Sequence, residues 1–515
     1  MILTCILLAP AIGAALLFAI PQQRILWIRS IAVAATSIAL AGALWITAHY
    51  DRAIAGYQFT QQIPWIDTLG VSYHVGVDGI SVVLVLLHAL CAFTGVLISF
   101  AIKERAKEYY LFYLLLITGV FGVFLSLDLF FFYLFYEMAV IPMYPLISIW
   151  GSTDREYASM KLTLYLTAGA VLALLGLLSI YLTSGAHTFD VVALQQHLAQ
   201  QPLSRQFQVW VFPFLAIGFG VIAPMWPLHS WSPIGHAAAP SAVSMLHAGV
   251  LMKLGSYAII RLALTLLPLG AHAWLPWIAA LCIMNVTYGG FVAMAQKDLK
   301  FIIGYSSSSH MGYVLLGIAA LTPLGLDGAV LLMFAHGLMT ALAFALIGHI
   351  YDQTHTRIVG DLGGLATAMP FIGTAAVMMA MASSGLPGFA NFVAETMIFF
   401  GAWDRYPLHT ILAVFGIVIT ATYMLRLVRG VFFGPLNRRW THLQDAVAAG
   451  ERLPYVLLIA ALLAVGCWPA LLAQTIDASA RPLVQHIVAI GPSDTPTSPL
   501  PRPLRLTRRG QEPLR

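Results

Sequence analysis

The sequence has few charged residues. Asp, Glu, Lys and Arg make up 9% of its 515 residues, whereas soluble domains carry about 25% charged residues. Hydrophobic residues make up 60% of the chain. This composition leaves no room for a soluble domain, so we exclude a soluble enzyme. We expect the lipid bilayer, and no nucleic acid, around the chain.

The sequence also lacks the motifs that hold metals, clusters or nucleotides. Its four cysteines stand far apart in apolar segments, and without paired spacing they indicate neither a zinc site nor an iron–sulfur cluster. They are Cys5, Cys91, Cys282 and Cys467. No Gly-rich dinucleotide fingerprint and no phosphate-binding loop follows a strand pattern. We therefore expect no cofactor, no metal and no redox centre on this chain.

Long hydrophobic runs are what the sequence has instead. A run of about 20 apolar residues crosses a hydrocarbon core of ~30 Å as a helix, and such runs recur from end to end. We predict an all-α polytopic membrane protein with about fourteen transmembrane helices. Their predicted starts lie near residues 2, 28, 78, 109, 129, 161, 209, 239, 273, 301, 327, 366, 407 and 453. The first run lacks the charged start of a signal peptide, so we predict a retained helix.

The charges between the runs predict an orientation, because cytoplasmic loops keep an excess of Lys and Arg. Alternate gaps, beginning after the first helix, hold fifteen Lys and Arg residues, and the other gaps hold only Arg52, Arg205, Arg261 and Arg405. This asymmetry predicts that both termini lie on the non-cytoplasmic side. The tail at 491–515 is basic and Pro-rich, and we predict a disordered end that does not set the topology.

Two of the hydrophobic runs are interrupted. "GFGVIAPMWPLHSW" at 218–231 and "SSGLPGFANF" at 383–392 place Pro, Gly and polar residues inside predicted helices 7 and 12. These helices lie five apart, which predicts two repeats of five helices, and an odd-numbered repeat must be inverted in the membrane. Inverted repeats with broken helices mark ion paths in transporters. The alternative is a pair of ordinary proline kinks that neighbouring helices repair.

These breaks predict how the chain is divided. Helices 1–3 occupy residues 1–108, and helices 4–8 form the first repeat at 109–263. Helices 9–13 form the second repeat at 273–430, and helix 14 lies at 453–475. We predict no amphipathic helix after helix 14.

Five ionisable side chains lie well inside predicted helices. They are Glu137, His247, Lys253, His336 and Glu395. A charge near the bilayer centre costs roughly 2.5–3.5 kcal/mol on insertion scales, so such groups face partners or water inside the bundle. Desolvated lysines and carboxylic acids can titrate near neutral pH, and histidines do so without help. The set therefore suits a proton relay, with structural ion pairs and buried hydrogen bonds as the alternative.

Two further points concern the arrangement of these groups. His247 and Lys253 are six residues apart, about 120° around a helix, so they do not share a face. The polar run "GYSSSSHMGY" contains His310. This run could hydrogen-bond a file of water, or it could hold helix 10 against its neighbours.

Five stretches carry a resemblance to a known family. They are "YEMAVIPMYPLISIWG", "HAGVLMKLGSYAIIR", "QKDLKFIIGYSSSSHMGYVLLG", "MFAHGLMTALAFALIGHIYDQTHTR" and "LPGFANFVAETMI". In order and spacing they resemble the antiporter-like subunits M of respiratory NADH–quinone oxidoreductase, complex I, whose mitochondrial counterpart is subunit 4. The resemblance covers residues 70–440.

The resemblance implies a fourteen-helix subunit with two inverted five-helix repeats and a central row of charged residues that moves protons. The glutamate of helix 5 maps to Glu137, the lysine of helix 8 to Lys253 and the acid of helix 12 to Glu395. The histidines of "SHMG" and "AHGL" map to His310 and His336.

One position departs from the family pattern. The family has a lysine two residues before the first proline of the helix 7 break, and Ile222 stands there. The motif "HAAAP" also lacks the acid usual in the family. In one account His247 takes over the base, since it aligns with a histidine that the related subunit L uses in helix 8. In the other account the relay is cut, and the chain is a divergent paralogue.

The resemblance also implies surroundings. We expect a bacterial cytoplasmic membrane, L-like and N-like antiporter subunits as partners, and quinone, FMN and iron–sulfur clusters in partner subunits. Alternatives within the transport class are a subunit of a sodium/proton antiporter, a membrane-bound hydrogenase or an inorganic carbon transporter. The alternative of another class is a structural subunit that does not pump.

Overall fold

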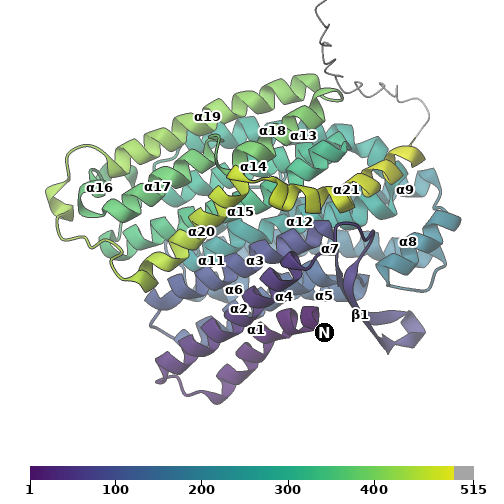
Figure 1. Cartoon of the computed structure of the whole chain (residues 1–515), viewed down its shortest axis with the longest axis horizontal. Coiled ribbons are helices and arrows are strands. Elements are labelled where there is room, and N and C mark those ends of the chain that lie inside the picture. Colours follow the sequence, from purple (N-terminus) through teal and green to yellow (C-terminus); the bar gives the residue numbers. More distant parts are fainter. Residues whose placement is uncertain (492–515) are drawn as a thin grey trace, which may run out of the picture.

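The computed structural model describes residues 1–491, so the predicted tail at 491–515 lies, except for its first residue, outside the described residues. Helices run side by side through the molecule, with α1 and α2 at one edge and α19 at the opposite edge (Figure 1). The N-terminal part contains α1 (Ile2–Ala19), α2 (Ile25–Ala48), β1 (Gln58–Ile66), β2 (Val71–Val77) and α3 (Gly79–Ile98).

The segment of the first predicted repeat contains helices 4 to 8. They are α4 (Ala106–Leu125), α5 (Leu129–Val140) with α6 (Met143–Trp150), α7 (Arg155–Ser184), α9 (Arg205–Ile222) with α10 (Trp231–Ala238), and a helix that starts as α11 (Ser241–Leu246). That helix continues through the π-helical segment η3 (His247–Leu251), α12 (Met252–Ala258) and a second π-helical segment, η4 (Ile259–Leu264). A short helix, α8 (Val191–Gln200), precedes α9.

The segment of the second predicted repeat contains helices 9 to 13. They are α13 (Pro268–Ala295), α14 (Leu299–Ala320), α15 (Pro323–Thr354), α17 (Pro370–Ser383) with α18 (Ala390–Trp403), and α19 (Pro407–Phe432). A short helix, α16 (Leu365–Ala368), precedes α17, and α20 (Ala449–Cys467) and α21 (Ala470–Ile490) follow α19.

The predicted polytopic helical fold is confirmed. Within residues 1–491, twelve helices are long and apolar enough to cross a membrane. The other two predicted spans are helix 12, which is divided into two halves of 14 residues, and α14, whose serine run makes it more polar. The centre of the bundle is formed by α15 and by the helix from Ser241 to Leu264, whose most apolar stretches are entirely buried.

Helices 7 and 12 are broken, as the sequence predicts. In helix 7, the loop between α9 and α10 is held by Asn285 of α13. The Asn285 carboxamide accepts a hydrogen bond from the Trp226 N–H (2.6 Å) and donates to the carbonyls of Pro224 (2.8 Å) and Ser308 (3.1 Å). The Trp231 indole donates to the Val221 carbonyl at 2.9 Å. Backbone groups freed by the break thus find partners, which a break inside a membrane requires.

The second helix of each predicted repeat starts in the same way. Asp128 accepts hydrogen bonds from the first N–H groups of α5, and Asp298 does the same for α14. Such caps satisfy the free donors at a helix start. Asp128 also pairs with the backbone of Asp190, after the third helix of its repeat, and Asp298 with Ile358, after the third helix of the other. This recurrence is what a repeat produces, and the inversion stays a prediction.

Three elements correct the sequence analysis. The antiparallel hairpin of β1 and β2 lies between helices 2 and 3, where weak alternation between long apolar runs gave no signal. The last predicted helix, 453–475, ends in the structure at Cys467, because the chain turns at Trp468 and Pro469. The helix that follows, α21, is amphipathic: it buries Ile476, Val484 and other apolar residues while Arg481 on its other face stays exposed. The prediction of no amphipathic helix after helix 14 is therefore wrong.

Candidate functional site

Four predicted residues form one continuous buried row, each from a different helix. Lys253 of α12 lies with its Nζ atom 2.8 Å from Nδ1 of His336 in α15. The His336 ring lies 5.1 Å, centroid to centroid, from the ring of His310 in α14. Nδ1 of His310 lies 3.4 Å from Oε1 of Glu395 in α18. None of the four is more than 1% exposed, and we call them the buried row.

The π-helical segment η3 positions the lysine. Nζ of Lys253 also donates to the carbonyl oxygen of Ala248, which lies in this segment. A π-helical turn shifts the register of a helix and is frequent at functional sites. The hydrogen bonds to Ala248 and His336 together fix the ammonium group of Lys253 at the start of the row.

The helix 12 break positions the acid at the other end. Gly385 in the break has φ +65°, a conformation that favours glycine. A Cβ atom built on Gly385 would lie 2.6 Å from Oε2 of Glu395. The broken backbone therefore approaches the carboxylate as closely as a glycine allows, which explains why the chain has no side chain there.

The row contains polar atoms that no protein group satisfies. Both ring nitrogens of His310, Nε2 of His336 and Oε1 of Glu395 are buried without a hydrogen-bond partner among residues 1–491. Buried polar atoms in native proteins are normally paired, and exceptions are typical of functional sites. The 3.4 Å contact between His310 and Glu395 is too long for a good hydrogen bond. The four groups of the row are therefore close together, while some of their polar atoms have no hydrogen-bond partner in the described part of the chain.

His247 is the first residue of η3, in the same helix as Lys253. Its ring stacks on Trp231 at 5.2 Å between centroids and meets the ring of His236 at 4.3 Å. Both His247 ring nitrogens lack hydrogen-bond partners in the described part of the chain. Nε2 of His236 lies 3.0 Å from the hydroxyl of Ser232. Lys253 is near enough for its charge to act on both histidines.

Ile222 is fully buried at the end of α9. A Cβ atom on Gly255 would lie 2.5 Å from Cγ2 of Ile222, so this side chain packs on the α12 backbone two residues beyond Lys253. An apolar side chain therefore fills the place where the family pattern has a lysine.

The structure does not bring Glu137 into the buried row. Glu137 is half-buried in α5 and lies beside Tyr133, one turn earlier. Within residues 1–491 it forms no ion pair. Of the six predicted site residues, four form the row, His247 adjoins it, and Glu137 lies apart.

Sequence reasoning missed three buried charged or titratable groups, His236, Lys300 and Arg261. His236 lay in the motif noted only for its missing acid. Lys300 and Arg261 were counted as loop charges, but both are buried in helices: Nζ of Lys300 donates to the Ala239 carbonyl at 2.6 Å, and Arg261 forms an ion pair with Asp78. The position of Arg261 inside an apolar stretch was a signal, whereas Lys300 follows Lys297 and Asp298 at a helix start. The partners of Arg261 and Lys300, far away in the sequence, were not predictable.

The chain is similar to known proteins over nearly its whole length. Residues 126–420 match the model of the family described as NADH:quinone oxidoreductase/Mrp antiporter, TM. NAD(P)H-quinone oxidoreductase chain 4 of Gloeobacter violaceus is 34% identical over 503 residues, covering 95% of this chain and 94% of the relative. NADH-quinone oxidoreductase subunit M of Rhodobacter capsulatus is 35% identical over 465 residues, covering 88% and 90%. The chain belongs to this family.

A solved structure agrees with that assignment. A chain in respiratory complex I from Thermus thermophilus with bound NADH matches with a TM-score of 0.87 and 29% identity, over 95% of this chain and 100% of that one. The family match contains both helix breaks, all six predicted site residues and Ile222. The resemblance stated from the sequence is therefore confirmed, and it covers the segment that holds the buried row.

Proposed function

We propose that this chain is a proton-translocating membrane-arm subunit of a complex I type NADH–quinone oxidoreductase. The observation that carries the proposal is the buried row from Lys253 to Glu395. Family membership supports the parent complex, since its relatives bear the names of subunit M and chain 4. Its partners are other subunits of such a complex, among them L-like and N-like antiporter subunits.

The buried row can pass a proton from Lys253 to Glu395 in three transfers. A proton on the Lys253 ammonium moves along the 2.8 Å hydrogen bond to Nδ1 of His336, leaving a neutral amine. The opposite ring nitrogen of His336 releases a proton toward His310, and His310 passes one to the Glu395 carboxylate. The first two transfers move a positive charge from one group to the next, and the last one neutralises both His310 and Glu395. Charges interact strongly where water is scarce. A change of charge at either end therefore drives the row.

His247 is the residue that supplies the base in place of the lysine absent at Ile222. It has two unpartnered ring nitrogens, lies against His236, and shares a helix with Lys253. Protons reach Lys253 through His236 and His247 on this account. Glu137 lies apart from the row in α5, and no transfer step passes through it.

The redox chemistry of the parent complex belongs to partner subunits, which carry the quinone, FMN and iron–sulfur clusters. This chain supplies no redox centre and translocates protons only. The orientation follows from the Lys and Arg asymmetry, with both termini on the periplasmic side of a bacterial cytoplasmic membrane.

Proton pumping by the reconstituted parent complex tests the proposal. We expect Lys253→Ala to lower the protons moved per electron pair, at matched assembly and electron-transfer rate, because it removes the first member of the row. Lys103→Ala, which removes an exposed lysine from a loop, is the matched control and leaves the ratio unchanged. An unchanged ratio in Lys253→Ala would exclude proton transfer through the row.

A structural subunit that does not pump is the second candidate. The fully buried Ile222 and the isolated position of Glu137 favour it. The variant Ile222→Lys separates the two. If Ile222→Lys raises the ratio while Lys253→Ala has no effect, the relay is cut at the helix 7 break and the subunit is structural. If Lys253→Ala lowers the ratio, His247→Ala is the next variant, and we expect it to lower the ratio as well.

A further inference from the structure

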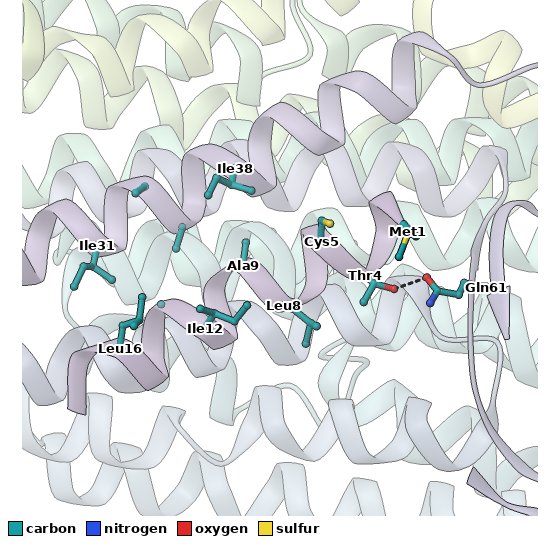
Figure 2. Close-up of a pocket in the computed structure, with 13 residues that line it drawn as sticks. Met1, Thr4, Cys5, Leu8, Ala9, Ile12, Leu16, Ile31, Ile38 and Gln61 are labelled. Atoms are coloured by element: carbon teal, nitrogen blue, oxygen red, sulfur yellow. Dashed lines mark hydrogen bonds between the residues drawn. The ribbon is translucent and has the colours of Figure 1, made fainter. Parts of the chain in front are cut away.

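An apolar groove lies along α1 and α2, at one edge of the bundle (Figure 2). It has a volume of about 510 Å³. On α1 its lining recurs at helical spacing from Met1 to Leu16, and on α2 it extends from Ile31 to Ile38. At one end Gln61 of β1 meets Thr4, whose hydroxyl donates to it at 2.8 Å. Apart from this end the lining is apolar.

The groove follows most of the length of α1. From Met1 to Leu16 its lining covers fifteen steps of ~1.5 Å, or about 22 Å. This lining is apolar, as contact with a chain of methylene groups at carbon distances of ~4 Å requires.

The face of α2 that lines the groove continues to a positive charge. Arg24, Trp27, Ile31, Ala34 and Ile38 follow one another at intervals of three and four residues, which places them on one side of the helix. Trp27 is 59% exposed and Arg24 is exposed at the N-terminus of α2. Tryptophan favours the membrane interface, and arginine there binds phosphate. Within residues 1–491 the Arg24 side chain forms no ion pair.

The dimensions agree with one leaflet. From Trp27 to Ile38 the helix rises about 17 Å, close to half of a ~30 Å hydrocarbon core. We propose that the groove between α1 and α2 binds one acyl chain of an anionic phospholipid, with the lipid phosphate on Arg24 and the glycerol region beside Trp27. The small side chain of Ala34 leaves the space that the acyl chain fills. The site is independent of proton transfer.

Photolabelling of the purified parent complex in nanodiscs tests this site. The discs contain phosphatidylcholine with a small fraction of phosphatidylglycerol that carries a diazirine in one acyl chain, and labelled peptides are identified by mass spectrometry. In the wild type we expect labelling of peptides from α1 and α2. Ala34→Trp fills the groove and should reduce this labelling severalfold. Ser37→Trp adds the same side chain outside the groove lining and should leave it unchanged.

A change of probe and the variant Arg24→Gln test the contact with the lipid head group. Replacing the phosphatidylglycerol probe with a phosphatidylcholine probe should weaken labelling, and Arg24→Gln should reduce the preference about fivefold, as the loss of ~1 kcal/mol per basic residue requires. Ala9→Phe fills the groove from α1 and replaces Ala34→Trp if that variant fails to assemble. The proposal is overturned if the wild type is not labelled there, if both tryptophan variants are labelled equally, or if Arg24→Gln leaves the lipid preference unchanged.

Discussion

Replacing Gly385 with alanine should disable the buried row without touching any of its members. The new Cβ would lie 2.6 Å from Oε2 of Glu395, whereas comfortable contacts begin near ~3.4 Å. A comfortable contact therefore requires the Glu395 carboxylate to move by about 0.8 Å. Such a displacement is large for a group that exchanges protons, since a misplacement of ~1 Å can cost about 100-fold in rate. Alanine at a positive φ costs another ~1–2 kcal/mol.

Gly388 provides the control, because it also has a positive φ but a Cβ atom there would contact no neighbouring atom. Gly388, in the same loop, has φ +100° and no neighbouring atom within 4 Å of a built Cβ. Gly388→Ala therefore reports the cost of backbone strain alone. The assay is the number of protons moved per electron pair by the reconstituted parent complex, together with its yield. We expect Gly385→Ala to fall toward the value of Glu395→Ala, and Gly388→Ala to stay near wild type.

Two results would refute this reasoning. If both glycine variants lower the ratio to the same extent, the effect comes from the loop and not from Glu395. If Gly385→Ala pumps normally at full yield, the carboxylate either moves freely or takes no part in proton transfer.

Other predictions concern stability. Asn285→Ala leaves the Trp226 N–H without its partner, at ~1–3 kcal/mol for a buried group, so the parent complex should inactivate at lower temperature. Arg261→Ala leaves the buried Asp78 without its ion-pair partner, at ~3–5 kcal/mol, so yield should fall. Adding Asp78→Ala should recover part of it, because that change also removes the cap of α3. Burial raises the pKa of Asp190, but hydrogen bonds, chiefly from His74, outweigh it and lower the pKa below its usual value. This contact stabilises above the unfolded pKa of ~3.9 and is lost as pH falls through the folded pKa, so hydrogen exchange of β1 and β2 should rise below about pH 4.

Lys253 and Glu395 of the buried row were predictable because placing an ionisable side chain inside the membrane costs free energy. A lysine or a glutamate in the middle of an apolar helix is expensive, so Lys253 and Glu395 stood out against their neighbours. The sequence could not predict their order in space. That order depends on α15 lying between α12 and α14, which brings His336 between Lys253 and His310.

The misses have two physical causes. Arg261 and Lys300 were assigned to loops because each lies toward one end of a predicted hydrophobic run. In the structure Asp78, 183 residues away, pairs with Arg261, and only tertiary packing creates such a pair. The helix α21 was missed because the apolar run continues to Leu472 past the turn at Trp468 and Pro469. Hydropathy alone does not separate the end of a span from the start of an amphipathic helix.

The hydrogen bonds of Asn285 connect the break in helix 7 to the segment of the second predicted repeat. The loop from Ala223 to Ser230 interrupts a helix of the first predicted repeat, and the carboxamide that clasps it is fixed to α13 of the second. The second half of helix 7, α10, carries Trp231 and His236, on which His247 rests. One carboxamide of the second predicted repeat thus supports the half-helix of the first on which His247 packs.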